Sequence, residues 1–412
     1  MHIQLPTSVL GLKNFYSLRV DETGLLNELQ DTKPEVYEQY LLGNWKVLFT
    51  HEFLSDVSGT NANAADLSPR RSCQPLSGEE FRDKVLGIVF GVAIGDAVGL
   101  ATEFQSPIQA AVCYGSGEPS LVSPTWAKNI FRDKHRIHWE EGDWTDDTDQ
   151  MILIMKAFCD CNDNTGLFLT TFSHYLLSWA HRGYPDLGDA GGAGIGQTLT
   201  KTLLHPEFLQ NPHAAARNIY ADSEGRAAAN GGVMRTAVTG IPYYYDLEKT
   251  ADFTIQVCKV THADPRCYSS AVAISIAIAM ILQGYSDVEF IRNSAFVYTM
   301  NYAPESSHTE LKKYILAENA KELDLAERNS IGYTFKAMGC GFVALRYKSF
   351  SDAIIRITME AGDADTNGAV AGGVMGAFTG YSKLPANWLS ALVHHDWLLA
   401  ETERFLQAVS SP

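Results

Sequence analysis

Two rows of glycine, each repeating every fourth residue, constrain the fold of this chain more than any other feature. The first row is Gly87, Gly91, Gly95 and Gly99, and the second is Gly368, Gly372, Gly376 and Gly380. Four residues is close to one helical turn, so each row lies on one face of a helix. A glycine costs a helix about 1 kcal/mol relative to alanine. The rows therefore predict helices that another backbone approaches closely, as at the centre of a helical bundle.

The rest of the chain also favours helices. Ser77 and Glu80 form a capping-box pattern, and the segment 168–181 has amphipathic helical spacing. Asp264 is placed as an N-cap, with Pro265 in the first turn that follows. Few segments alternate with period two, so we expect the main domain to be all-α.

An acidic stretch at residues 142–150 precedes an apolar run. It reads Gly-Asp-Trp-Thr-Asp-Asp-Thr-Asp-Gln, and we interpret Thr145 as a helix N-cap with Asp146 and Asp147 in the first turn. Acids near a helix start are favoured by the helix dipole. Several carboxylates at one helix end nevertheless repel each other unless a cation lies among them. This stretch alone leaves ordinary capping slightly ahead of metal binding.

A second stretch far downstream repeats the same chemistry. Residues 360–368 contain Asp363, Asp365 and Thr366 and again lead into a small, apolar segment. Two such helix starts can converge and supply carboxylate and hydroxyl oxygens from two sides. Oxygen ligands suit a hard cation, Mg²⁺ or Mn²⁺, rather than zinc.

Composition limits the possible partners. The 412 residues carry a formal net charge of −16, which argues against nucleic acid or an anionic membrane as a partner. A phosphate ligand stays compatible, because a bound cation can invert the local field. Seven cysteines without framework spacing indicate a reducing compartment, and the most apolar stretch, Ala271 to Leu282, is too short to span a bilayer. With no secretory signal recognised, we predict a cytoplasmic protein.

The N-terminal part differs from the rest. We predict an extension and linker at residues 1–70, in which 58–72 is polar and rich in small residues, followed by the main domain at 77–408. Residues 1–57 are either an arm packed on the main domain or a segment that binds a partner protein. Trp45, Phe49 and Phe53 are the kind of aromatic anchors that interfaces use.

Other candidate residues carry weaker signals. The glycine-rich loop 188–196 could cradle a phosphate, particularly if Thr198 starts the next helix. Asn230 is placed to cap a helix. Asp96, Glu103 and His262, each taken alone, are expected to be ordinary solvated or structural residues.

Together these pieces resemble the ADP-ribosylglycohydrolase family, which includes the dinitrogenase-reductase-activating glycohydrolases and the ADP-ribosyl-acceptor hydrolases. The resemblance covers about residues 77–400. The motifs that carry it, in the family's order, are Gly95-Asp-Ala-Val-Gly99 with Glu103, Trp144-Thr-Asp-Asp-Thr-Asp149, Asn230-Gly-Gly-Val-Met-Arg235, Thr261-His-Ala-Asp264 and Gly362-Asp-Ala-Asp-Thr366.

The resemblance implies a compact orthogonal multi-helix bundle with a central cleft for two Mg²⁺ ions, which Mn²⁺ could replace. The implied metal ligands are Thr145, Asp146, Asp147, Asp363, Asp365 and Thr366. The residues implied in catalysis are Glu103, Asp147 and Asp365. The residues implied in substrate binding are Gly192, Gly194, Gly196, Asn230, Gly231, Gly232 and His262.

The implied reaction is removal of ADP-ribose from modified protein side chains. Cleavage at C1″ of the distal ribose passes through an oxocarbenium-like centre, and a water activated by the metal pair or held by Glu103 can attack it. The Thr-Asp-Asp-Thr-Asp form of the acidic motif resembles the arginine-directed, bacterial-type members more closely than the serine-directed ones, and extra acids near the cleft would suit a guanidinium leaving group. Some bacterial members resemble immunity proteins, so residues 1–57 could also bind and block an ADP-ribosyltransferase toxin.

Overall fold

The computed structural model describes residues 76–114, 133–161 and 164–410. Across these ranges the regular structure consists of the α-helices α5 to α19 and short 3₁₀ turns, without a β-strand; Ala229 and Tyr333 form one isolated β-bridge. The prediction of an all-α fold is confirmed. The predicted N-terminal extension and linker, including residues 1–57, lie outside the described residues.

The helices differ widely in length. The longer ones are α5 (Gly78–Gly99), α7 (Asp146–Cys161), α8 (Thr165–Arg182), α10 (Pro212–Asp222), α11 (Leu247–Lys259), α12 (Pro265–Leu282), α13 (Val288–Thr299), α15 (Thr334–Ala344), α17 (Ala364–Thr379) and α19 (His395–Ser410). The shorter ones are α6 (Pro107–Tyr114), α9 (Gln197–Leu203), α14 (His308–Ile315), α16 (Phe350–Thr358) and α18 (Ala386–Leu389).

The two glycine-bearing helices, α5 and α17, pack against each other. A β-carbon placed on Gly91 would lie 2.2 Å from the carbonyl oxygen of Gly372, and one on Gly372 would lie 1.9 Å from that of Gly91. Gly87 faces Gly376 in the same way, so the helices run antiparallel. No side chain fits between these backbones. The predicted close approach is correct, and its partner is the second glycine row.

The fourth glycine of the second row has a different role. Gly380 follows the last residue of α17 and has a φ of +86°, a left-handed conformation that side chains disfavour. It therefore ends the helix, whereas Gly99 in the first row contacts the carbonyl of Ala364 at the start of α17.

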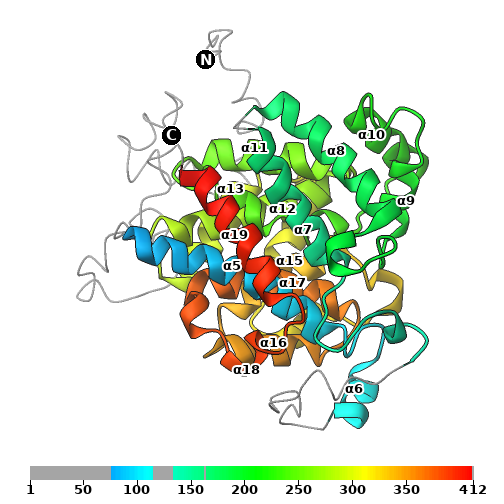
Figure 1. Ribbon diagram of the computed structural model, residues 1–412. Coiled ribbons are helices and arrows are strands. Elements are labelled where there is room, and N and C mark those ends of the chain that lie inside the picture. The colour runs from blue at the N-terminus through cyan, green and yellow to red at the C-terminus, as the bar shows by residue number, and fades with distance from the viewer. Residues whose placement is uncertain (1–75, 115–132, 162–163, 411–412) are drawn as a thin grey trace, which may run out of the picture.

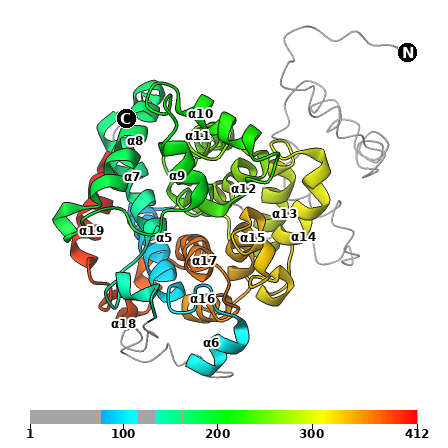
Figure 2. The same cartoon turned by 90° about the vertical axis from the view of Figure 1, so that its right-hand side faces the viewer.

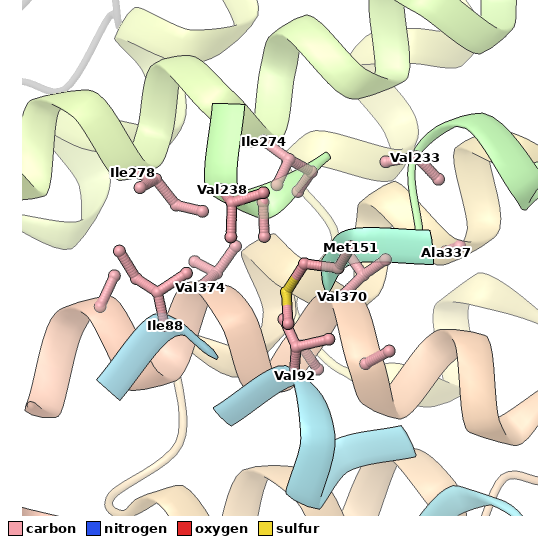
Figure 3. Packing of buried hydrophobic residues seen from close by; sticks show 14 of the residues in the cluster. Ile88, Val92, Met151, Val233, Val238, Ile274, Ile278, Ala337, Val370 and Val374 are labelled. Atoms are coloured by element: carbon pink, nitrogen blue, oxygen red, sulfur yellow. The ribbon is translucent and has the colours of Figure 1, made fainter. Parts of the chain in front are cut away.

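The α5–α17 pair forms the centre of the molecule, and the other helices surround it (Figures 1 and 2). Figure 3 shows the apolar contacts that fill this centre: Val92 of α5, Met151 of α7, Ile274 of α12, Ala337 of α15 and Val374 of α17, all completely buried. Helices from the start, middle and end of the described chain therefore share one core.

Helix α12 is the most apolar of the described helices. Its 18 residues are long and apolar enough, by length and composition, to cross a membrane, but 83% of them are buried inside the protein. The helix is longer than the stretch Ala271 to Leu282 judged too short from sequence, so its burial, rather than its length, identifies it as a core helix.

The predicted helix starts have mixed outcomes. The capping box of Ser77 and Glu80 is present, and Asp264 caps α12 with Pro265 in the first turn. The prediction for Asn230 is wrong, because Ala229 occupies the cap position of a short 3₁₀ turn and the Asn230 amide is bonded elsewhere.

Candidate active site

The N-termini of α7 and α17 open onto one cavity of about 950 Å³, which we call the cleft. Asp146 and Asp147 come from the first turn of α7, and Asp365 and Thr366 from the first turn of α17. Glu103 lies in the turn after α5 and lines the same wall. The further residues that line the cleft include Asp363, Gln150, Gly194, Gly196, Asn230, Gly231, His262, Arg266, Arg328 and Tyr333.

Three carboxylates of the cleft lie very close together. Oxygens of Glu103, Asp363 and Asp365 are all within 4.8 Å of one another. Asp147 extends this acidic wall, and its buried Oδ1 has no hydrogen-bond partner among the described residues. Burial, and then repulsion by neighbouring carboxylates, raises the pKa values of Asp146, Asp147 and Asp365. Such a cluster is unfavourable by itself and favours a bound cation.

Asp96, from the buried face of α5, holds the start of α7 in place. Its carboxylate accepts hydrogen bonds from the backbone N–H groups of Thr145 and Thr148, at 3.0 to 3.1 Å and 3.0 Å. Both threonine hydroxyls also donate to it, at 2.9 and 2.6 Å. The cap of α7 is therefore supplied by another helix. The expectation that Asp96 is solvated is wrong.

Two left-handed turns fix the distance between Glu103 and Asp363. Phe104 has a φ of +57°, and Ala361 and Gly362 have φ values of +60° and +75°. The N–H of Phe104 donates to the carbonyl of Gly362 at 2.6 Å, and the N–H of Gly362 donates to the carbonyl of Gln105 at 3.3 Å. Each turn thus supports the other, and strain of this kind is typical of functional sites.

The Glu103 side chain is oriented by a histidine. Nε2 of His135 lies 2.5 Å from Oε2 of Glu103, and the imidazole packs edge-on against Trp139. The hydrogen bond to Glu103 raises the pKa of His135. Arg136, which is buried, donates to the backbone carbonyls of Leu100, Ala101 and Glu103 and so holds the turn itself.

Glycines and polar groups line the cleft beside the acidic wall. A β-carbon on Gly194 would lie 2.3 Å from Oδ1 of Asp146, so the loop backbone reaches the acidic wall. Asn230 donates from Nδ2 to Oδ2 of Asp363 at 2.8 Å. A β-carbon on Gly231 would lie 3.0 Å from both Cε1 and Nε2 of His262.

The described fold and cleft lie within a region of the chain that matches a known protein family. The profile of the ADP-ribosylglycohydrolases matches residues 77–412. The chain belongs to the ADP-ribosylglycohydrolase family. The resemblance inferred from the five motifs is thereby confirmed, and the match begins at residue 77, where the predicted main domain begins. The domain boundaries at 77 and 408 and the separate extension at 1–70 stay predictions.

Relatives of the glycohydrolase cover most of its length. It is 26% identical to the ADP-ribosylarginine hydrolase Tri1 of Serratia proteamaculans over 324 residues, and the aligned region covers 77% of each of the two chains. It is 24% identical to the ADP-ribosylhydrolase ARH3 of Mus musculus over 345 residues, and the aligned region covers 73% of this chain and 85% of ARH3. A solved structure titled ADP-ribosylglycohydrolase-related protein complex shares the fold, with a TM-score of 0.57, 20% identity, and 80% and 99% of the two chains covered.

Most of the site residues predicted for this glycohydrolase lie together around the cleft. Thr145 is buried just behind the acidic wall, with its hydroxyl 3.4 Å from Oδ2 of Asp147. Gly192 packs on the ring of Trp179 and Gly232 on Cys258, and the structure places neither among the described residues that line the cleft. Contact of these two glycines with substrate stays a prediction.

Two acids of the stretch 142–150 lie away from the cleft. Asp149 accepts hydrogen bonds at 2.9 Å from the indole nitrogens of Trp144 and Trp179, and burial raises its pKa to about 8. Asp143 accepts from the backbone N–H of Trp144. The four acids therefore divide into a cleft pair, Asp146 and Asp147, and two structural groups.

Sequence reasoning missed four residues of the site: Asp96, His135, Gln150 and Arg235. Asp96 had a usable signal, since it is an acid inside a helix that the glycine row places at the centre of the bundle. Arg235 ends one of the family motifs but has no local charge partner. His135 had no signal, because its contact with Glu103 depends on how the chain returns to the cleft.

The donor atoms of the acidic wall fit a hard divalent cation. Aspartate carboxylates from both helices, Glu103 and the hydroxyl of Thr366 supply only oxygen. The proton of the Thr145 hydroxyl is donated to Asp96, which leaves the lone pairs of that oxygen available to a cation. Oδ1 of Asp147, which no described residue contacts by a hydrogen bond, is a further possible ligand atom.

Proposed function

We propose that this glycohydrolase removes ADP-ribose from modified arginine side chains and uses two Mg²⁺ ions, which Mn²⁺ can replace. The observation that carries the proposal is the convergence of two acidic helix starts and Glu103 on one wall of a single cleft, in a chain of this family.

The proposed metal ligands are the side chains of Thr145, Asp146, Asp147, Asp363, Asp365 and Thr366. When bound, the ions would supply Lewis-acid positions that fix the hydroxyls of the distal ribose and balance the charge of the four aspartates. The hydrogen bonds from Asn230 to Asp363 and from Gln150 to Asp146 orient two of these carboxylates before any ligand binds.

Glu103 is the proposed proton acceptor. Its carboxylate is buried and bonded to His135, and burial raises its pKa. A carboxylate held in this way can take a proton from the water that attacks C1″, and a raised pKa brings it closer to the pH at which the reaction runs. Asp147 and Asp365 are proposed to act in catalysis as neighbours of the reacting sugar.

Two observations support the arginine linkage. Relatives named ADP-ribosylarginine hydrolase share about a quarter of the sequence with this chain. Glu103, the carboxylate of the cluster that is not a proposed metal ligand, also suits a guanidinium group, which binds carboxylates through charge-assisted hydrogen bonds.

The experiment is release of free ADP-ribose from two synthetic peptides, one modified on arginine and one on serine. We expect release from the arginine peptide with Mg²⁺ or Mn²⁺ and loss of release with EDTA. Release from the serine peptide alone would keep the hydrolase proposal and reject the linkage. Rescue of EDTA-treated protein by Zn²⁺ but not by Mg²⁺ would reject the oxygen-ligand assignment, and release from neither peptide would reject the proposal.

A further inference from the structure

A continuous line of buried hydrogen bonds joins two walls of the cleft behind its surface. It begins at Asp146, whose Oδ2 accepts from Nε2 of Gln150 at 2.6 Å. Oε1 of Gln150 accepts from Nη1 of Arg235 at 2.7 Å, and Nη2 of Arg235 donates to Oγ1 of Thr261 at 2.6 Å. The line ends at His262, whose Nδ1 lies 2.8 Å from the same hydroxyl oxygen.

The middle of this line is sealed from solvent. Gln150 and Arg235 are completely buried, and Thr261 is 1% exposed. The guanidinium of Arg235 lies 5.3 Å from the ring centre of Phe172, and its pKa is lowered to about 10 by burial, so it stays charged at neutral pH. A buried charge of this kind requires its hydrogen-bond acceptors.

Arginine can only donate hydrogen bonds, and this fixes the direction of the line on both sides. Toward Asp146, Arg235 must contact the oxygen of the Gln150 amide, so the amide nitrogen is turned to the carboxylate. Toward His262, the Thr261 oxygen accepts from Arg235, and its own proton needs another acceptor. Of the two groups that contact this hydroxyl among the described residues, only Nδ1 of His262 has a lone pair.

The proton of a neutral His262 must therefore be on Nε2. Burial, and then the charge of Arg235, lowers the pKa of His262 to about 3, so the ring is neutral at physiological pH. The Nε2 edge lies against Gly231, and a side chain at position 231 would cover it. Glycine at this position keeps the edge open toward the cleft, which His262 lines.

We propose that Arg235, acting through Thr261, is a positioning residue that fixes the proton of His262 on Nε2, so that His262 offers an N–H donor to ligands in the cleft. The group it would recognise is an acceptor oxygen, a phosphate oxygen or ribose hydroxyl of ADP-ribose, and this identification of the ligand rests on the proposed function. Arg235 also orients the carboxylate of Asp146 through Gln150, so this one buried guanidinium orients both Asp146 and His262.

The first test is the tautomer of His262, observed by long-range ¹H–¹⁵N correlation on the full chain labelled with ¹⁵N-histidine. The variant His262→Asn assigns the signal. We expect the Nε2–H form in the wild type and in Thr261→Ser, which keeps the hydroxyl. We expect Thr261→Val to populate the Nδ1–H form, because no donor then contacts Nδ1.

Thr239→Val is the matched control. Thr239 is equally buried, and its hydroxyl contacts Thr236 and Thr254 rather than His262. This variant should leave the His262 signal unchanged even if it lowers stability. Arg235→Met, if it folds, should give a mixture of the two His262 tautomers. If it does not fold, the Thr261 variants alone test the proposal.

The second readout is calorimetric binding of ADP-ribose, with and without Mg²⁺. Loss of one hydrogen bond predicts about tenfold weaker binding for Thr261→Val, restored in Thr261→Ser. An Nδ1–H form in the wild type, or an unchanged Nε2–H form in Thr261→Val, would overturn the proposal while leaving the hydrolase proposal intact. Conversely, if His262 carries its proton on Nε2 as expected but no ADP-ribose is released from either peptide, only the proposed function is rejected.

Discussion

Gly95 of α5 and Gly368 of α17 are in direct backbone contact. A β-carbon on Gly95 would lie 2.0 Å from the carbonyl oxygen of Gly368, and one on Gly368 would lie 2.1 Å from that of Gly95. Asp96 is adjacent to the first glycine and holds α7, and Asp365 lies one turn before the second. The contact therefore sets the separation of the two acidic helix starts on the wall of the cleft.

Replacement of Gly95 by alanine should disrupt this contact. Neither backbone can move without shifting a helix, so we expect Gly95→Ala to lower the free energy of unfolding by at least about 3 kcal/mol, the upper end for over-packed cores. Urea denaturation at constant m-value measures this change. Gly78→Ala is the control, because nothing lies within 4 Å of a β-carbon there. Equal stability of both variants would contradict the packing argument.

Removal of a cleft carboxylate should separate activity from stability. We expect Asp146→Ala and Asp365→Ala to reduce ADP-ribose release by at least about 100-fold, because a metal contributes several kcal/mol to the transition state. In EDTA their melting temperatures should equal or exceed that of the wild type, because one repelling charge is gone. Undiminished turnover in either variant would remove the metal assignment.

The matched control for these variants is Asp149→Asn. Asp149 is a half-buried acid of α7, the helix of Asp146, but its carboxylate accepts hydrogen bonds from Trp144 and Trp179 outside the cleft. Mg²⁺ at 100 times its Kd should stabilise the wild type and Asp149→Asn by about 2.7 kcal/mol for each ion bound, and the Asp365 variant by less. Thermal denaturation with and without Mg²⁺ measures this difference.

His135 should act on the rate rather than on ligand affinity. Without its hydrogen bond the Glu103 carboxylate can rotate, so we expect His135→Ala to lower kcat about tenfold or more and to leave the Kd for ADP-ribose unchanged. His138→Ala is the control, since His138 is exposed and lies only three residues away. A normal kcat in His135→Ala would show that Glu103 needs no support from this side chain.

Protonation of His262 should destabilise the protein in acid. Its pKa in the folded state is about 3, below the ordinary value of 6.5. As the pH falls below 6.5, His262 therefore takes up a proton in the unfolded chain before it does so in the folded protein. The free energy of unfolding is highest above pH 6.5 and decreases as the pH falls toward 3. Over that window the difference between the wild type and His262→Asn should change by up to about 1.4 kcal/mol per pH unit. Parallel stability curves from urea denaturation would contradict this.

The sequence predicts the class of fold and the chemistry of the site from local patterns. Glycine at every fourth position indicates close helix packing, and the acids before two small-residue helices indicate oxygen ligands. Neither pattern identifies its partner: the spacing places Gly91 on one face but does not show that Gly372 lies opposite. That pairing depends on the tertiary fold.

Local rules failed where a distant group competed for a side chain. Asn230 has a strong capping preference, yet its amide donates to Asp363, 133 positions away. Asp96 was expected in solvent because isolated acids usually are, but four donors from the start of α7 make its burial favourable. Hydrogen bonds between distant segments cannot be read from spacing alone.

The α5–α17 pairing also has a consequence for biosynthesis. Helix α5 leaves the ribosome long before its partner, and the hydroxyl of Thr102, just after α5, donates to a carbonyl 256 positions later. At roughly 5–20 residues per second, this separation corresponds to tens of seconds. During that interval the glycine-lined face of α5 lacks the α17 backbone that covers it in the folded protein. The two halves of the acidic wall come together only once α17 has been made, so an incomplete chain cannot act on its substrate.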